Sequence, residues 1–183
     1  MYRIKNDKRV RQSAELIREG LFRCLREKGL DQIGVSEIAS ASGVSRGTFY
    51  RIFDTPVDVL AYACDTLTAK AQERFARSGN PVDDKAFLFW LRFWLGESEV
   101  LEALYRSGRT DILEKSLYPY FKSFRPEPLN AFTDTEMEYI GIAAASFLGG
   151  ILTVWIRHGR KESPEELFGL YQRFLAVFQL PGK

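Results

Sequence analysis

Residues 35–53, VSEIASASGVSRGTFYRIF, predict two short helices joined by a tight turn. Three apolar residues at intervals of three and four give the first helix one edge for the core: Val35, Ile38 and Ala39. Gly43 interrupts this pattern, and glycine tolerates the positive φ that a sharp turn between helices requires. Ser45 then offers a side-chain oxygen to the free N–H groups at the start of the second helix.

The second helix of this pair has one face for the core and another for a partner. At 100° per residue, Phe49, Ile52 and Phe53 lie within one arc of about 100°. Gly47 and Arg51 lie on the opposite side, where a guanidinium can bind a phosphate or two base acceptors. Spacing alone leaves two interpretations open, namely a DNA-binding surface or a helical hairpin whose arginines are only solvated.

The segment GVSRGTFYRIF, at residues 43–53, resembles the helix-turn-helix of the TetR family of bacterial transcriptional regulators. The resemblance is specific over roughly residues 8–60 and looser beyond them. In that family the second helix enters the major groove of DNA, and the first helix of the pair supports it. The resemblance and the neighbouring polar residues nominate these DNA contacts: Lys8, Ser36, Ser45, Arg46, Gly47, Thr48, Tyr50 and Arg51.

Two positions depart from the family pattern. Members often carry His where this chain has Ile52 and Lys where it has Pro56, and both are commonly associated with the phosphate backbone. Neither replacement can donate a hydrogen bond there, so each lost contact should weaken DNA binding and reduce its salt dependence. We expect basic residues near the N-terminus to compensate, namely Lys5, Lys8, Arg9 and Arg11.

The distribution of charge separates a head, residues 1–53, from a body, residues 54–183. The head carries 11 Lys and Arg against 6 Asp and Glu, whereas the body carries 15 against 18. A basic head on a mildly acidic body is typical of a protein whose first part binds nucleic acid. We therefore expect a DNA-binding domain at 1–53 and an effector-binding and dimerisation domain at 54–183.

No strand-like alternation of apolar and polar residues persists along the chain, so the sequence predicts an all-α fold. We expect about nine helices, with three in the head and a helical bundle in the body. Outside the pair described above, the expected ranges are 7–28, 56–77, 83–96, 98–107, 110–124, 133–158 and 163–178. Pro119 should kink or end the helix that contains it.

The last two predicted helices carry the expected dimer interface. The segment 133–158 is apolar nearly all round, so one side should meet its own body and another a second subunit. Gly141, Ala145 and Gly149, four residues apart, permit close approach of another helix. The TetR resemblance implies a four-helix bundle formed by two copies, with these interface candidates: Ile151, Val154, Trp155, His158, Leu167, Leu170, Tyr171 and Phe174.

Aromatic residues are numerous in the body and allow two interpretations. They can fill the core, or a subset can line an apolar cavity. The resemblance implies the second, because the body of TetR-like proteins binds a small effector that releases DNA. We expect a hydrophobic or aromatic effector, with these lining candidates: Trp90, Phe93, Trp94, Tyr105, Tyr118, Phe121, Tyr139 and Phe147.

The sequence offers little for an enzyme, a metal site or a membrane span. His158 is the only histidine, and its expected place at a helix end suits a charge or an interface group more than proton transfer. Cys24 and Cys64 lack metal-binding spacing and are expected to be buried apolar residues. The uncharged run 140–156 is marginal in length for a bilayer, so we expect a buried helix. No metal, cofactor or membrane contact is expected, and the N-terminus lacks the apolar run of an export signal.

Together these features predict a homodimeric, cytoplasmic regulator that binds double-stranded DNA. The favoured form is a repressor that a small effector releases from a palindromic operator. Two alternatives stay open, a ligand-dependent activator and a helical protein-interaction adaptor whose head has lost DNA binding. Ile52 and Pro56 motivate the adaptor.

Overall fold

The computed structural model describes residues 2–4, 7–78, 84–125, 127 and 129–178. Across these residues the chain forms nine α-helices and no β-strand, which confirms the all-α prediction. The helices are α1 (Lys8–Leu25), α2 (Val35–Ser42), α3 (Arg46–Ile52), α4 (Pro56–Ser78), α5 (Asp84–Gly96), α6 (Ser98–Arg106), α7 (Asp111–Ser123), α8 (Asp134–Arg157) and α9 (Pro164–Phe178). Short 3₁₀ turns occur at Leu30–Gln32 and Leu129–Ala131.

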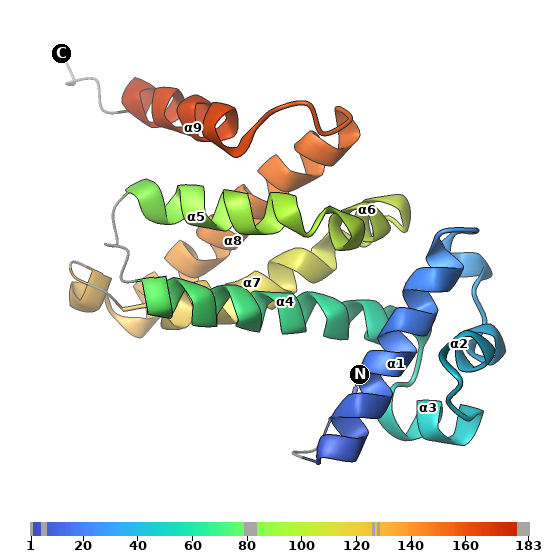
Figure 1. The fold of residues 1–183 in the computed structure, drawn as a ribbon. Coiled ribbons are helices and arrows are strands. Elements are labelled where there is room, and N and C mark those ends of the chain that lie inside the picture. The colour runs from blue at the N-terminus through green and yellow to red at the C-terminus, as the bar shows by residue number, and fades with distance from the viewer. Residues whose placement is uncertain (1, 5–6, 79–83, 126, 128, 179–183) are drawn as a thin grey trace.

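The helices are arranged as a small head and a larger body joined through α4 (Figure 1). Helices α1, α2 and α3 pack on one another in the head, while α4 contacts both α1 and α7. In Figure 1, α4, α5 and α9 run roughly parallel as stacked layers, and α7 and α8 cross them obliquely. A buried hydrogen bond of 2.7 Å between the hydroxyls of Thr68 and Ser116 fastens α4 to α7. Helix α4 therefore connects the head to the body.

The core of the head unites the apolar faces of its three helices. The fully buried side chains at its centre are Ile17, Leu21, Ile38, Phe49 and Ile52. Gly20 allows α1 and α2 to cross closely, because an added Cβ would lie 2.8 Å from the Ser42 Cβ. The apolar faces of α2 and α3 thus pack on α1.

The residues before α1 are fastened to the junction of α3 and α4. Tyr2 forms an isolated antiparallel bridge with Phe53, and the Arg3 N–H donates to the Ile52 carbonyl at 2.8 Å. The Tyr2 hydroxyl donates to Asp65 in α4. Burial of the Tyr2 ring, together with this carboxylate, raises the pKa of Tyr2. The start of the chain therefore holds the head against α4.

Helix α1 differs from its predicted range, whereas α7 keeps its predicted range although it contains Pro119. Helix α1 ends at Leu25 instead of residue 28, and the chain turns so that Leu30 is buried. Helix α7 continues through Pro119 to Ser123, so the proline does not end it. Proline removes one N–H, so residue 119 supplies no hydrogen bond to the Lys115 carbonyl one turn earlier, and the helix nevertheless continues.

Helix α8 approaches α7 closely through small residues. An added Cβ on Gly141 would lie 2.8 Å from the Lys122 backbone nitrogen, and one on Gly149 would lie 3.2 Å from the Glu114 Cγ. Ala145, between them, is fully buried. The close approach predicted from the small residues is therefore made within the chain.

By length and composition alone, α8 would suffice to cross a membrane. Helices in protein cores meet the same measure, so this property is weak evidence for a span. In this fold α8 packs along α7 and contacts α5 and α6.

Candidate nucleic-acid interface

The turn before α3 sets the direction of that helix. Gly43 adopts a left-handed conformation with φ of 69°, and Ser45 is extended. The Ser45 Oγ accepts a hydrogen bond from the Thr48 N–H at 3.1 Å, which confirms Ser45 as the helix cap. Its hydroxyl also donates to the Thr48 Oγ1 at 3.0 Å. The two hydroxyls therefore hold each other at the exposed start of α3.

Helix α3 has the two faces that its sequence predicts. Phe49 and Ile52 are fully buried, whereas Arg46 and Arg51 are exposed. Tyr50 is 48% exposed, and its ring meets Phe49 edge-on at 5.7 Å between centroids. The outer face of α3 thus presents the guanidiniums of Arg46 and Arg51 to solvent, together with the Tyr50 ring that packs on Phe49.

Gly47 lies on this exposed face, and the fold gives no packing reason for a glycine there. An added Cβ would meet only the Ser45 Oγ, at 3.9 Å. The missing side chain leaves the α3 backbone open to close approach from outside. This arrangement suits contact with the wall of a DNA groove.

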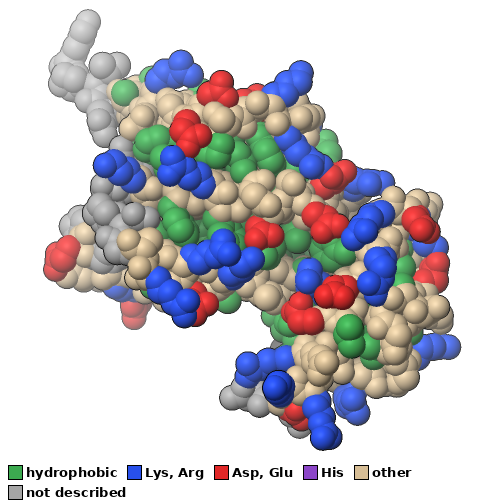
Figure 2. Space-filling model, viewed as in Figure 1, with side chains coloured by type: hydrophobic (Ala, Val, Ile, Leu, Met, Phe, Trp, Pro, Cys, Tyr) green, Lys and Arg blue, Asp and Glu red, His purple; other side chains and the backbone are tan. Residues whose placement is uncertain are grey.

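The flanking candidates also lie on the surface. Ser36 is exposed in the first turn of α2, and Lys8 is exposed at the start of α1. Arg9 and Arg11 are exposed as well, whereas Lys5 lies outside the described residues. Figure 2 shows Lys and Arg side chains projecting along the lower edge of the head, where Figure 1 places α3 and the start of α1.

The Ile52 side chain is unavailable to DNA because it is fully buried in the head. Its backbone carbonyl accepts the hydrogen bond from Arg3 described above. Pro56 serves as the first residue of α4, where its missing N–H carries no penalty. Both departures from the family pattern therefore have structural roles in this chain.

The candidate effector residues do not converge on one cavity among the described residues. Three of them, Trp90, Phe93 and Trp94, are buried in the core. Trp90 contacts Phe121 with ring centroids 5.2 Å apart, so this part of the body is filled by its own aromatics. The buried Trp94 Nε1 has no hydrogen-bond partner among the described residues.

The remaining effector candidates are dispersed over the body. Tyr118 and Tyr139 border one shallow surface groove, and the Tyr139 side chain is 73% exposed. Tyr105 lies on α6, where it is partly exposed. Phe147 packs on Tyr171 at 5.5 Å between ring centroids. The prediction of an aromatic pocket in the body stays a prediction.

The candidate dimer residues divide between the surface and the core. Val154, Leu170 and Phe174 are exposed to 41%, 54% and 48%. Ile151 and Tyr171 are half-buried, and His158 is exposed at the end of α8. The exposed apolar members lie on α8 and α9, the two helices expected to meet a second subunit.

Trp155 and Leu167, also predicted at the interface, contribute mainly to the chain's own body. Their side chains are 6% and 8% exposed. The Trp155 Nε1–H donates to the Glu162 carbonyl at 2.9 Å, which closes the turn between α8 and α9. The sequence did not separate the inner faces of α8 and α9 from the outer ones, and the dimer interface itself stays a prediction.

Among the described residues, no three His, Cys, Asp or Glu side chains are placed to hold a metal ion. Cys64 is fully buried, and this burial raises the pKa of its thiol to about 12. Cys24 is only half-buried, which differs from the expectation of two buried cysteines. Burial nevertheless raises the pKa of Cys24, so both thiols stay protonated near neutral pH.

Comparison with known proteins relates the head to a regulatory family. Residues 17–61 match the bacterial regulatory proteins of the tetR family. Lin0861 from Listeria innocua has a similar structure, with a TM-score of 0.82 and 14% identity over 97% of this chain and 96% of that one. No curated protein sequence matches the chain.

Two further solved structures share the fold over nearly their whole length. The fatty acid degradation regulator FadR from Bacillus halodurans has a TM-score of 0.57 and 16% identity, over 98% of this chain and 100% of that one. The TetR family repressor AlkX from Dietzia sp. has a TM-score of 0.52 and 15% identity, over 90% and 94%. At such identities these structures show a common fold alone.

Proposed function

This chain belongs to the TetR family of bacterial regulatory proteins, and from that premise we propose that it is a homodimeric transcriptional repressor. It binds a palindromic operator in the bacterial cytoplasm and leaves it when a small molecule binds. The observation that carries the proposal is the exposed face of α3, with Arg46, Gly47 and Arg51 above a buried Phe49. AlkX, which shares the fold, is itself described as a repressor.

The residues of the interface have distinct roles in this proposal. Arg46 and Arg51 reach base acceptors or phosphates, since a guanidinium offers several donors in a planar fork. The hydroxyls of Ser45, Thr48 and Tyr50 contact phosphate oxygens. Ser36 and Lys8, at the starts of α2 and α1, contact the backbone on either side.

A second subunit is required because one head covers only a few base pairs. The exposed apolar side chains of α8 and α9, led by Leu170 and Phe174, form the interface with the second copy. A two-fold axis then presents two α3 helices to two half-sites about one helical turn apart. The two heads together roughly double the free energy of binding.

A small effector acts by favouring one of two body shapes. Helix α4 joins the head to α7 through the buried Thr68–Ser116 hydrogen bond. A shift of α7 therefore moves α4, and with it the distance between the two heads. A ligand that binds better to the shifted shape lowers DNA affinity by the same factor by which DNA lowers the affinity for the ligand.

We expect Arg51→Ala to weaken operator binding by about 1–3 kcal/mol, which is about 5- to 150-fold. The operator is first selected from randomised duplexes, and an inverted repeat is the expected product. Affinity is then measured at several salt concentrations, because loss of a phosphate contact reduces the salt slope by about one whereas loss of a base contact relaxes sequence preference.

The control for this variant is Arg77→Ala. Arg77 is exposed near the end of α4 and pairs with Glu73 at 2.6 Å. This variant removes the same charge but should keep operator affinity. Equal affinity of the Arg51→Ala protein and the wild type would remove Arg51 from the interface, and recovery of sequence-indifferent binding alone would favour the adaptor.

A Gly47→Ala substitution distinguishes an effect on operator affinity from an effect on the free energy of unfolding. The fold has room for the added methyl group, so the free energy of unfolding should stay the same or rise by up to about 1 kcal/mol. Operator affinity should fall about tenfold, because the methyl group would keep the α3 backbone away from the groove wall. Denaturant titration and fluorescence anisotropy on the same preparation measure both quantities. Unchanged affinity would show that no close backbone approach occurs at this residue.

A further inference from the structure

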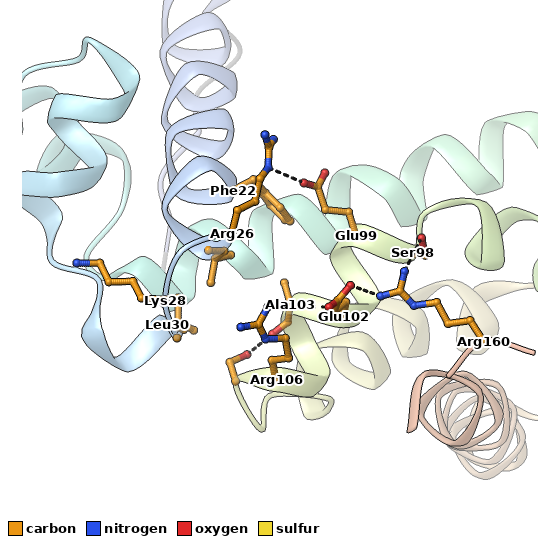
Figure 3. A pocket seen from close by; sticks show the side chains of 13 residues that line it. Phe22, Arg26, Lys28, Leu30, Ser98, Glu99, Glu102, Ala103, Arg106 and Arg160 are labelled. Atoms are coloured by element: carbon orange, nitrogen blue, oxygen red, sulfur yellow. Dashed lines mark hydrogen bonds and ion pairs between the residues drawn. The ribbon is translucent and has the colours of Figure 1, made fainter. Parts of the chain in front are cut away.

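A cleft of about 380 Å³ lies where the head meets the body. Figure 3 shows its two walls: residues from the end of α1 and the following turn on one side, and α6 with Arg160 on the other. This volume falls within the range of small-molecule sites. None of the eight aromatic residues predicted to line an effector pocket borders this cleft.

The cleft carries an excess of positive charge. Its lining includes four basic side chains, Arg26, Lys28, Arg106 and Arg160, and two carboxylates, Glu99 and Glu102. Lys28 is paired outside the lining, with Glu37 of α2. Even after that pair is set aside, three guanidiniums face two carboxylates.

The Glu102 carboxylate lies near two of these guanidiniums but forms a hydrogen bond with only one of them. Its carboxylate accepts a hydrogen bond from Arg160, whereas Arg106 approaches it only to 3.9 Å, which is longer than a hydrogen bond. Across the cleft, Arg26 and Glu99 are 3.5 Å apart and both are largely exposed. Arg106 and Arg26 therefore retain donor capacity that a second anion could use.

Arg160 reaches the cleft at a conformational cost. Its φ is 60°, and it is the one non-glycine residue at positive φ in the described part of the chain. Such a conformation is unfavourable for a long side chain and is found where the surroundings enforce it. Here it directs the guanidinium to Glu102 and to the Ser98 hydroxyl, both on α6.

The rest of the lining consists of four apolar side chains together with Gly29, Ser98 and Ser107. Phe22 and Leu30 of the head and Ala103 of α6 are almost fully buried at the base of the cleft, and Leu25 is half-buried beside them. An apolar base beneath a cationic rim matches a molecule with an apolar body and one anionic group. A purely inorganic anion would leave the apolar base in contact with water.

We propose that this cleft binds an organic carboxylate with an apolar body, held by Arg106 and Arg26 above Phe22 and Leu30. Because one wall belongs to the head and the other to the body, movement of the head changes the shape of the site. A ligand there binds the two head positions with different affinity, which couples it to DNA. Only this coupling rests on the proposed function, since binding itself requires no DNA.

The test uses the full-length protein without DNA and 4-phenylbutyrate as the probe, followed by isothermal titration calorimetry. We expect saturable binding at millimolar concentrations, and binding at least about tenfold weaker for the neutral amide 4-phenylbutanamide. Arg106→Gln should weaken the carboxylate about tenfold, whereas Glu102→Gln should strengthen it, because the competing carboxylate is lost. Arg77→Gln, the same change far from the cleft, should have no effect.

Several outcomes would overturn the inference. They are absence of saturable heat with the wild type, equal affinity for the acid and the amide, and equal affinity of the wild type and both cleft variants. Circular dichroism checks that each variant is folded, and Glu102→Gln tests the site by a gain that unfolding cannot mimic. A repeat with operator DNA measures the coupling. Failure of Arg51→Ala to affect DNA would leave the titration result intact, so the two proposals fail separately.

Discussion

A Leu170→Asp substitution is expected to convert the protein to a monomer and to lower its operator affinity at least about a hundredfold. Leu170 lies in the middle of α9 with 54% of its side chain exposed. In a two-fold interface each substitution occurs twice, so two carboxylates would be placed in an apolar contact without partners. A monomer then binds with one head and loses about half of the binding free energy.

Sedimentation velocity and anisotropy at the same protein concentrations test this expectation. Phe132→Asp is the matched control, since Phe132 is 41% exposed and follows the Leu129–Ala131 turn before α8. The control should remain a dimer with normal affinity. A Leu170→Asp protein that sediments as a dimer would contradict the assignment of α9 to the interface.

Local sequence rules predicted the helices and their starts well. Ser45 caps α3 as expected. Ser163 and Glu166, at the start of the predicted range 163–178, form a capping box for α9, with the Ser163 N–H donating to the Glu166 carboxylate at 2.8 Å. That backbone hydrogen bond lowers the pKa of Glu166. These features depend on residues within one helical turn, so their pattern is complete in the sequence.

The features that the sequence did not predict depend on residues far apart in the chain. The bridge between Tyr2 and Phe53 joins residues at the two ends of the head sequence, and no local pattern encodes it. The apolar stripe of α8 likewise contains both Val154, which is exposed, and Trp155, which is buried. Which side of an apolar helix faces its own body is decided by tertiary packing. The cleft between α1 and α6 has the same origin, because its walls meet only in the folded chain.

Two glycines of α8 differ in their packing, so substituting alanine for each should change the free energy of unfolding in opposite directions. Gly141→Ala should lower the free energy of unfolding by about 1–3 kcal/mol. Its Cβ would lie 2.8 Å from the Lys122 backbone nitrogen and 2.9 Å from the Lys122 Cα, distances that real Cβ atoms essentially never show. Backbone atoms cannot rotate away as a flexible side chain can, so α7 and α8 would have to separate.

Gly150→Ala on the same helix should instead raise the free energy of unfolding by about 0.5–1 kcal/mol. Gly150 is exposed, and an added Cβ there would meet nothing within 4 Å. Both substitutions gain the same helix propensity, so the difference between them isolates the contact with Lys122. Urea titration of the two variants at equal protein concentration measures that difference. If both variants were stabilised, α7 and α8 could separate without cost, and the close α7–α8 contact would not be a source of the body's stability.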